Sequence, residues 1–160
     1  MSNATLAKQV LAAARAKKRM IATAESCTGG MIAAALTDIA GSSDVVERGF
    51  VTYSNRAKTE LLGVPASLIQ KHGAVSEEVA RKMASGALKH APVALAVAVT
   101  GIAGPGGGSK GKPVGLVHFG LARKGKPVHA EHHVFKGNRA AVRRATVKRA
   151  LELLLEAAQS

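Results

Sequence analysis

A hydroxyl-rich turn stands at residues 25–30, where the sequence is ESCTGG. It follows a short apolar segment and precedes a helical one, and ligands of α/β proteins collect where strands end and helices begin. A helix start offers unpaired N–H groups and about half a positive charge, which suits a phosphate or carboxylate. Gly29 and Gly30 let a ligand approach the backbone, while Ser26 and Thr28 add hydroxyls. The turn predicts an anion-binding site; the alternative is an N-cap followed by two turn glycines.

The thiol of Cys27 in the same turn is a candidate nucleophile, because the start of a helix lowers the pKa of a thiol. No histidine lies nearby in the sequence to act as its base. Free cysteines are more often small buried apolar residues. We favour that second interpretation for Cys27.

A second polar group, residues 53–58, follows a predicted strand. If Asn55 caps the next helix, Lys58 lies in its first turn, where its charge opposes the helix dipole. That opposition lowers the pKa of the lysine, which a lysine general base requires. Tyr53 ends the strand and could reach the same cleft, and a serine activated by lysine with tyrosine assisting performs acyl transfer. The alternative is a lysine that extends into solvent, and from spacing alone we favour that interpretation.

A glycine-rich stretch, residues 101–111, follows the most hydrophobic run of the chain. Residues 106–111 fit G-x-G-x-x-G and residues 106–112 fit G-x-x-x-x-G-K, but a strand rather than a helix is predicted next. Pro113 also stands where a P-loop needs Ser or Thr. We reject both motifs. Thr100 and Gly101, at the end of the predicted central strand, remain candidates for meeting a substrate, whereas 106–111 is interpreted as a flexible loop.

Arg139 and Arg143 stand four residues apart in the first turns of the last predicted helix. This spacing places them on one face, where they could clamp a phosphate. Two exposed arginines without a ligand are the alternative.

Three histidines raise the question of a metal site. On a strand, His129 and His133 share a face, while His132 points the other way. Glu131 is the only acidic residue beside them. This is a poor ligand set, so we predict no metal site.

The elements that position these residues alternate between strands and helices early in the chain, and a hairpin comes late. This order predicts a three-layer α/β/α domain with a mixed, largely parallel sheet and a late antiparallel hairpin. No repeat or long linker interrupts the chain, so residues 1–160 are predicted to form a single domain. The expected strands are 20–24, 49–53, 93–99, 114–122 and 128–135, and the expected helices are 6–18, 31–39, 56–62, 66–71, 77–90 and 139–158.

Composition sets the class of protein. Lys and Arg outnumber Asp and Glu by 23 to 10, which favours an anionic ligand, but the basic residues are scattered and aromatic residues are scarce. That combination argues against nucleic acid as a partner. No apolar run reaches the ~18 residues of a membrane span, the start lacks a signal peptide's apolar region, and the one cysteine cannot form an internal disulfide. We therefore expect a cytoplasmic protein.

Five motifs together resemble the CinA family in its C-terminal domain. They are TAESCTGG at 23–30, GFVTYSN at 49–55, HGAVS at 72–76, TGIAGP at 100–105 and KPVG at 112–115. Their order and spacing match over nearly the whole chain. The resemblance implies an amidohydrolase that converts nicotinamide mononucleotide to nicotinate mononucleotide and ammonia, in pyridine nucleotide salvage.

The resemblance also implies roles for single residues. Ser26 falls on the family's nucleophile, and Tyr53 and Lys58 on the assisting residues, with Lys58 as a base. Substrate-binding positions fall on Thr28, Gly29, Gly30, Ser43, Thr100, Gly101, Arg139 and Arg143. The family implies no metal or organic cofactor and suggests a homo-oligomer.

Two other functions stay open at this point. One is a non-catalytic nucleotide-binding module with a regulatory role. The other is a basic protein associated with nucleic acid. Ser26, Tyr53 and Lys58 favour the enzyme over the binding module, and the scattered charge counts against nucleic acid.

Overall fold

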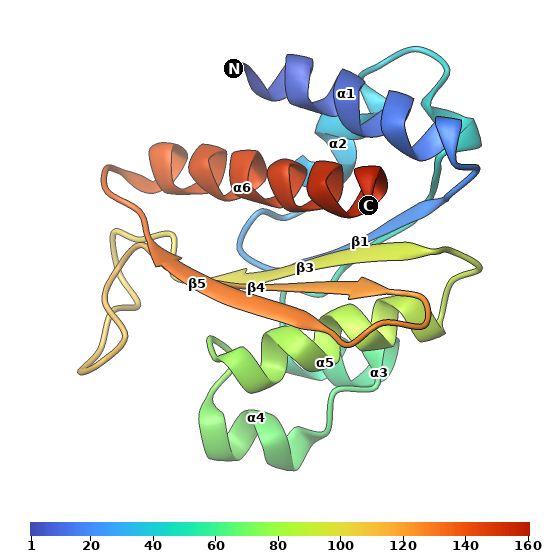
Figure 1. Cartoon of the computed structure of the whole chain (residues 1–160). Helices are drawn as coiled ribbons and strands as arrows, with labels where there is room; N and C mark the ends of the chain where they lie inside the picture. Colours follow the sequence, from blue (N-terminus) through green and yellow to red (C-terminus); the bar gives the residue numbers. More distant parts are fainter.

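A five-stranded mixed sheet forms the centre of the computed structural model, which describes residues 1–160 (Figure 1). In spatial order its strands are β2 (Val46–Val51), β1 (Ile21–Glu25), β3 (Leu95–Gly101), β4 (Leu116–Arg123) and β5 (His129–Val134). β1 runs parallel to both β2 and β3, whereas β3, β4 and β5 pair antiparallel. The predicted mixed sheet with its late hairpin is confirmed.

Helices cover both faces of this sheet (Figure 1). On one face lie α1 (Asn3–Ala16), α2 (Met31–Thr37) and α6 (Arg139–Gln159). On the other lie α3 (Asn55–Leu62), α4 (Ala66–His72) and α5 (Glu77–Lys89). A short 3-10 turn, Ser42–Asp44, joins α2 to β2. None of the helices combines the length and the apolar character needed to cross a lipid bilayer.

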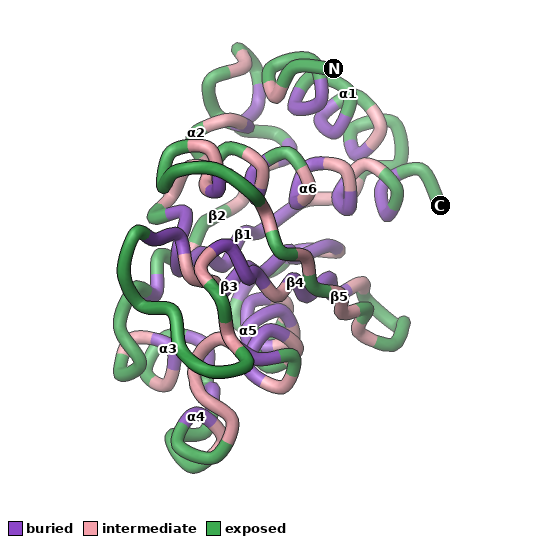
Figure 2. Tube along the Cα trace, turned by 90° about the vertical axis from the view of Figure 1, so that its left-hand side faces the viewer, coloured by how far each residue is buried: buried purple, intermediate pink, exposed green.

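The two central strands β1 and β3 are buried along almost their whole length, whereas the edge strands β2 and β5 are largely open (Figure 2). Aliphatic clusters fill both spaces between helices and sheet. A parallel strand that is covered on both faces carries few polar residues. The polar residues Glu25 and Thr100, buried at the ends of β1 and β3, are therefore exceptions that need an explanation.

Most element boundaries differ from the sequence-based expectation by one to three residues, and two of these differences have a clear physical reason. The second strand was expected at 49–53 but runs from Val46 to Val51, because an edge strand tolerates the charged residues that masked its start. The cap of α3 is Ser54 rather than Asn55: the Ser54 hydroxyl accepts a hydrogen bond from the Ala57 amide at 3.0 Å. Serine and asparagine cap helices about equally well, so their order in the sequence does not decide between them.

Candidate active site

The end of β1 fixes Ser26 beside the neighbouring strands. The Ser26 amide donates to the Val99 carbonyl at 3.1 Å, which continues the parallel ladder one residue beyond β1. On the other side, the Thr52 amide donates to the Glu25 carbonyl at 2.8 Å. Ser26 is only 8% exposed. Its backbone position is therefore set by the sheet and not by a free loop.

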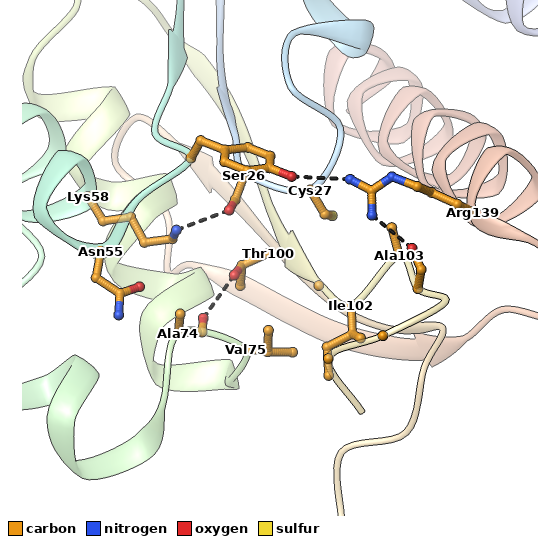
Figure 3. A pocket seen from close by; sticks show the side chains of 15 residues that line it. Ser26, Cys27, Asn55, Lys58, Ala74, Val75, Thr100, Ile102, Ala103 and Arg139 are labelled. Atoms are coloured by element: carbon orange, nitrogen blue, oxygen red, sulfur yellow. Dashed lines mark hydrogen bonds between the residues drawn. The ribbon is translucent and has the colours of Figure 1, made fainter. Parts of the chain in front are cut away.

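Lys58 approaches Ser26 from α3. Its Nζ lies 3.0 Å from Ser26 Oγ (Figure 3). It also lies 3.0 Å from the Thr52 carbonyl. The side chain is 1% exposed, and no carboxylate forms an ion pair with it. Burial lowers the pKa of Lys58 below its ordinary value. A buried amine with a lowered pKa, hydrogen-bonded to a serine hydroxyl, is the arrangement that general-base activation of a nucleophile needs.

The physical cause of this lowered pKa differs from the one expected. With Ser54 as the cap, Lys58 is the fourth residue of α3, at the end of its first turn. Loss of solvent, rather than the helix dipole, is the leading cause of the shift. The alternative of a lysine extending into solvent is wrong, because the ammonium points inward.

A cavity of about 290 Å³ opens over the Ser26 hydroxyl at the carboxyl ends of β1 and β3. Six of the residues predicted from the sequence line it: Ser26, Tyr53, Lys58, Thr100, Gly101 and Arg139. They come from four separate segments of the chain, and Figure 3 shows the labelled ones converging on one space. The cavity therefore joins the strand-end hydroxyls, the lysine and one arginine.

The other predicted site residues are not among those that line this cavity. Thr28 is fully buried and donates its hydroxyl to Glu25 Oε1 at 2.5 Å. Gly29 and Gly30 form the positive-φ turn into α2. Ser43 is exposed in the 3-10 turn just before the amino end of β2. Because β2 runs parallel to β1, this turn lies at the amino ends of the two strands, whereas the cavity lies at the carboxyl ends.

The expected anion site at the start of α2 is already occupied by the protein itself. The carboxylate of Glu25 accepts hydrogen bonds from the Ile32 amide (2.8 Å) and the Ala33 amide (3.0 Å). These are the second and third residues of α2, whose free N–H groups would otherwise attract a ligand. These two donors are therefore not vacant for an outside phosphate.

The two arginines at the start of α6 diverge despite their shared helix face. Arg139 donates to the Gly104 carbonyl (2.8 Å) and to the Tyr53 hydroxyl (3.1 Å), so it spans the mouth of the cavity (Figure 3). Arg143 donates instead to the carbonyls of Cys27 and Thr28, both at 3.2 Å. Only Arg139 is placed to meet a ligand in the cavity.

One wall of the cavity was missed as a site from the sequence. Ala74 and Val75 line it, and the Thr100 hydroxyl donates to the Ala74 carbonyl at 2.8 Å. Gly106 and Gly107 also line the cavity. Ala74 and Val75 are apolar, so their residue types do not indicate a functional site. Only the position of the HGAVS motif, between two predicted helices, could have indicated that they line one. Asn55 also lines the cavity.

The thiol of Cys27 lies beside the cavity but is suppressed as a nucleophile. It is 7% exposed, and burial raises its pKa to about 11. Only the thiolate is reactive, and little of it forms at neutral pH with such a pKa. The interpretation of Cys27 as a small buried residue fits this environment.

The histidines of β5 are engaged with carboxylate and ring partners. His129 and His133 both contact Glu131 through Nε2, at 2.8 and 2.5 Å. His132 points to the other face, where its ring lies beside that of His118. No group of three or more His, Cys, Asp or Glu side chains is arranged to hold a metal ion.

Comparison with known proteins places this architecture among close relatives. The family model described as CinA C-terminal domain matches residues 3–158. Nicotinamide-nucleotide amidohydrolase PncC of Escherichia coli K12 is 50% identical over 149 residues, covering 93% of this chain and 90% of the relative. A protein of the same name from Enterobacter agglomerans is 55% identical over 138 residues, covering 86% of this chain and 84% of the relative.

Other relatives are longer. The chain spans about a third (33%) of a putative competence-damage inducible protein of Caldicellulosiruptor bescii, at 51% identity over 86% of this chain. Among solved structures, the competence/damage inducible protein CihA of Agrobacterium tumefaciens superposes with a TM-score of 0.95 at 48% identity, covering 99% of this chain and 96% of that one. The fold is thus shared along almost the whole of both chains.

Proposed function

This chain belongs to the CinA C-terminal domain family, and from that premise we propose that it hydrolyses the carboxamide of nicotinamide mononucleotide to nicotinate mononucleotide and ammonia, as a step of pyridine nucleotide salvage. Support comes from two relatives named nicotinamide-nucleotide amidohydrolase that match most of both chains at 50% and 55% identity. The observation that carries the proposal is the contact of 3.0 Å between Lys58 Nζ and Ser26 Oγ.

The first chemical step uses that contact. Uncharged Lys58 accepts the proton of Ser26 Oγ, and the oxygen attacks the carboxamide carbon to give a tetrahedral intermediate. The protonated lysine then gives its proton to the departing nitrogen, so ammonia leaves and an acyl-serine ester remains. Water, deprotonated by Lys58, hydrolyses the ester, and the serine recovers its proton. Each proton is returned, and no cofactor is consumed.

The negative oxygen of the tetrahedral intermediate needs a donor close to Ser26. The amide of Cys27, which is the next residue and lines the cavity, donates no backbone hydrogen bond. It is the donor that we assign to the oxyanion, because Thr28, Gly29 and Gly30, the other residues of the turn, are not among those that line the cavity. The phosphate is assigned to Arg139, the cation at the cavity mouth.

Ammonia release from nicotinamide mononucleotide tests the proposal. We expect Ser26→Ala and Lys58→Met each to lower kcat by about a thousandfold or more, since removal of one member of a nucleophile–base unit disables the whole unit. Ser85→Ala and Lys82→Met, on α5 and outside the cavity, are the matched controls and should keep full activity. If the wild type binds the nucleotide but releases no ammonia, the proposed enzymatic function is wrong and the protein is a nucleotide-binding module.

A further inference from the structure

A second buried ionisable side chain, Glu25, stands next to the proposed nucleophile and has no part in the mechanism above. It is fully buried at the end of β1 and forms no ion pair. Its carboxylate accepts three hydrogen bonds, from the Thr28 hydroxyl and the amides of Ile32 and Ala33. All three neighbours are donors, which suits an ionised carboxylate. A buried carboxylate requires such compensation, because it loses its water.

The same side chain supplies the helix cap that α2 lacks. Helices α3, α5 and α6 are capped locally by Ser54, Ser76 and Asn138, each bonding an amide three residues on. The cap position of α2 is Gly30, which has no side chain to offer. Gly29 and Gly30 adopt φ values of 58° and 105°, a conformation that favours glycine. The turn therefore excludes a local cap, and a residue outside it must replace one.

The remote cap has a consequence that a local cap would not have. Glu25 precedes its amide partners by seven and eight residues, so its hydrogen bonds close a loop around Ser26, Cys27 and the turn. The backbone of this loop is tied to β3 through the Ser26 amide and to Thr52, the residue after β2, through the Glu25 carbonyl. The carboxylate adds the third attachment, to the start of α2. Arg143 holds the Cys27 and Thr28 carbonyls from the other side.

We propose that Glu25 is the positioning residue of the active site: by capping α2 from the sheet, its carboxylate fixes the turn that carries Ser26 and keeps Ser26 Oγ within reach of Lys58 Nζ. The role rests on the proposed function of Ser26 as nucleophile. Glu25 does not line the cavity, so it acts through Ser26 and not on the substrate. A misplacement of about 1 Å at a reacting group can lower a rate about a hundredfold.

The test variant is Glu25→Gln, which has nearly the same shape. An amide oxygen in place of Oε1 still accepts from Thr28 and Ile32, whereas the amide NH₂ faces the donating amide of Ala33. A milder variant, Thr28→Val, removes one of the three hydrogen bonds and keeps the carboxylate. The matched control is Leu36→Ala, which weakens the same helix at its other, buried end.

Three experiments separate positioning from general stability. They measure kcat and KM for ammonia release, the rate at which a fluorophosphonate probe labels Ser26, and the thermal midpoint. We expect Glu25→Gln to lower kcat about a hundredfold with KM within about twofold, and to slow the labelling equally. Thr28→Val should show the same pattern to a smaller extent. Leu36→Ala should lower the midpoint at least as much as Glu25→Gln yet retain kcat and labelling.

Several outcomes would overturn the role of Glu25. The role is wrong if Glu25→Gln leaves kcat and the labelling rate unchanged. It is also wrong if Leu36→Ala lowers kcat and the labelling rate as much as Glu25→Gln does. If Glu25→Gln does not fold, Thr28→Val decides by the same criteria. A wild type that labels at Ser26 but releases no ammonia contradicts the proposed substrate alone, and the labelling rates still judge Glu25. A wild type that neither labels nor releases ammonia contradicts both proposals.

Discussion

Lys58 and Glu131 are both largely withdrawn from water, and their surroundings are opposite. Lys58 is 1% exposed and has a hydroxyl and a carbonyl as its partners, with no carboxylate. Glu131 on β5, 18% exposed, receives hydrogen bonds from Arg149, His129 and His133. Loss of water lowers the pKa of Lys58, and Arg149, followed by the two histidines, holds the pKa of Glu131 well below its usual range. The environment of Lys58 therefore disfavours its charged form, whereas the environment of Glu131 favours its charged form.

This difference separates a reactive group from a structural one. A group whose charged form is disfavoured exchanges protons readily near neutral pH, as a general base must. A carboxylate whose charged form is strongly favoured stays ionised and joins elements, here β5 to α6 through Arg149. Burial alone does not identify a catalytic residue; the character of the partners does.

The largest expected effect is the pH dependence of the reaction. Only uncharged Lys58 can accept the serine proton, so kcat/KM should rise about tenfold per pH unit below the pKa of Lys58 and then level off. Because burial lowers that pKa, the plateau should begin below the ordinary lysine value of about 10.4. The measurement is kcat/KM against pH. A rate that continues to rise through pH ~10.5 would mean that Lys58 is not the base.

Stability provides an independent check on the same group. Since the pKa of Lys58 is lowered on folding, the unfolded chain binds more protons between the folded and the ordinary value. The free energy of unfolding of the wild type, relative to Lys58→Met, should therefore rise with pH across that window. Lys82→Met, at an exposed position, should show no such trend relative to the wild type.

The sequence predicted the reactive half of this comparison better than the structural half. Ser26 and Lys58 each follow a strand, and parallel strands bring their carboxyl ends together. From spacing alone a solvent-exposed lysine was the favoured interpretation of Lys58, and the family resemblance supplied its pairing with Ser26. The reason for the low pKa of Lys58 was not predictable, because burial depends on how α3 packs on the sheet. The contact of Glu131 with Arg149 joins residues 18 apart on different elements, and no local pattern reveals it.

The same limit explains the misassigned anion site. The ESCTGG turn was interpreted as an anion-binding site because a helix start offers unpaired N–H groups. The residue that does cap α2, Glu25, lies within the motif. Its hydrogen bonds to two amides of α2 are visible only in the folded structure. Similarly, Arg139 and Arg143 share a helix face, yet the carbonyls of the turn hold only Arg143. Spacing gives the face of a helix, but the neighbouring element decides what a side chain contacts.

Removal of the charge at Glu131 should affect stability and leave activity intact. Glu131→Gln is expected to lower the free energy of unfolding by about 1–3 kcal/mol at pH 7, because Arg149 loses its main partner. The folded pKa of Glu131 is lowered, so this stabilisation is present above the unfolded value of about 4.3 and is lost as the pH falls below it. Chemical denaturation at several pH values measures both features.

Glu156 provides the matched control for Glu131. It also contacts Arg149, at 3.4 Å, but is 64% exposed. Glu156→Gln should change the free energy of unfolding by less than about 1 kcal/mol, as exposed ion pairs do. An equal loss in both variants would show that burial of Glu131 is not what makes its contacts stabilising.

The smallest effect is expected at Tyr53, and it separates two roles for this residue. Tyr53 is 63% exposed, and its hydroxyl accepts a hydrogen bond from Arg139, which the Gly104 carbonyl also holds. Tyr53→Phe removes that one exposed hydrogen bond, worth about 0.5–1.5 kcal/mol, so KM should rise about 2- to 12-fold with kcat nearly unchanged. A hydroxyl that transfers a proton in the reaction would instead lower kcat about 10²- to 10⁴-fold. Steady-state kinetics of this single variant therefore decide whether Tyr53 assists the chemistry, as the sequence suggests, or orients Arg139, as its exposure favours.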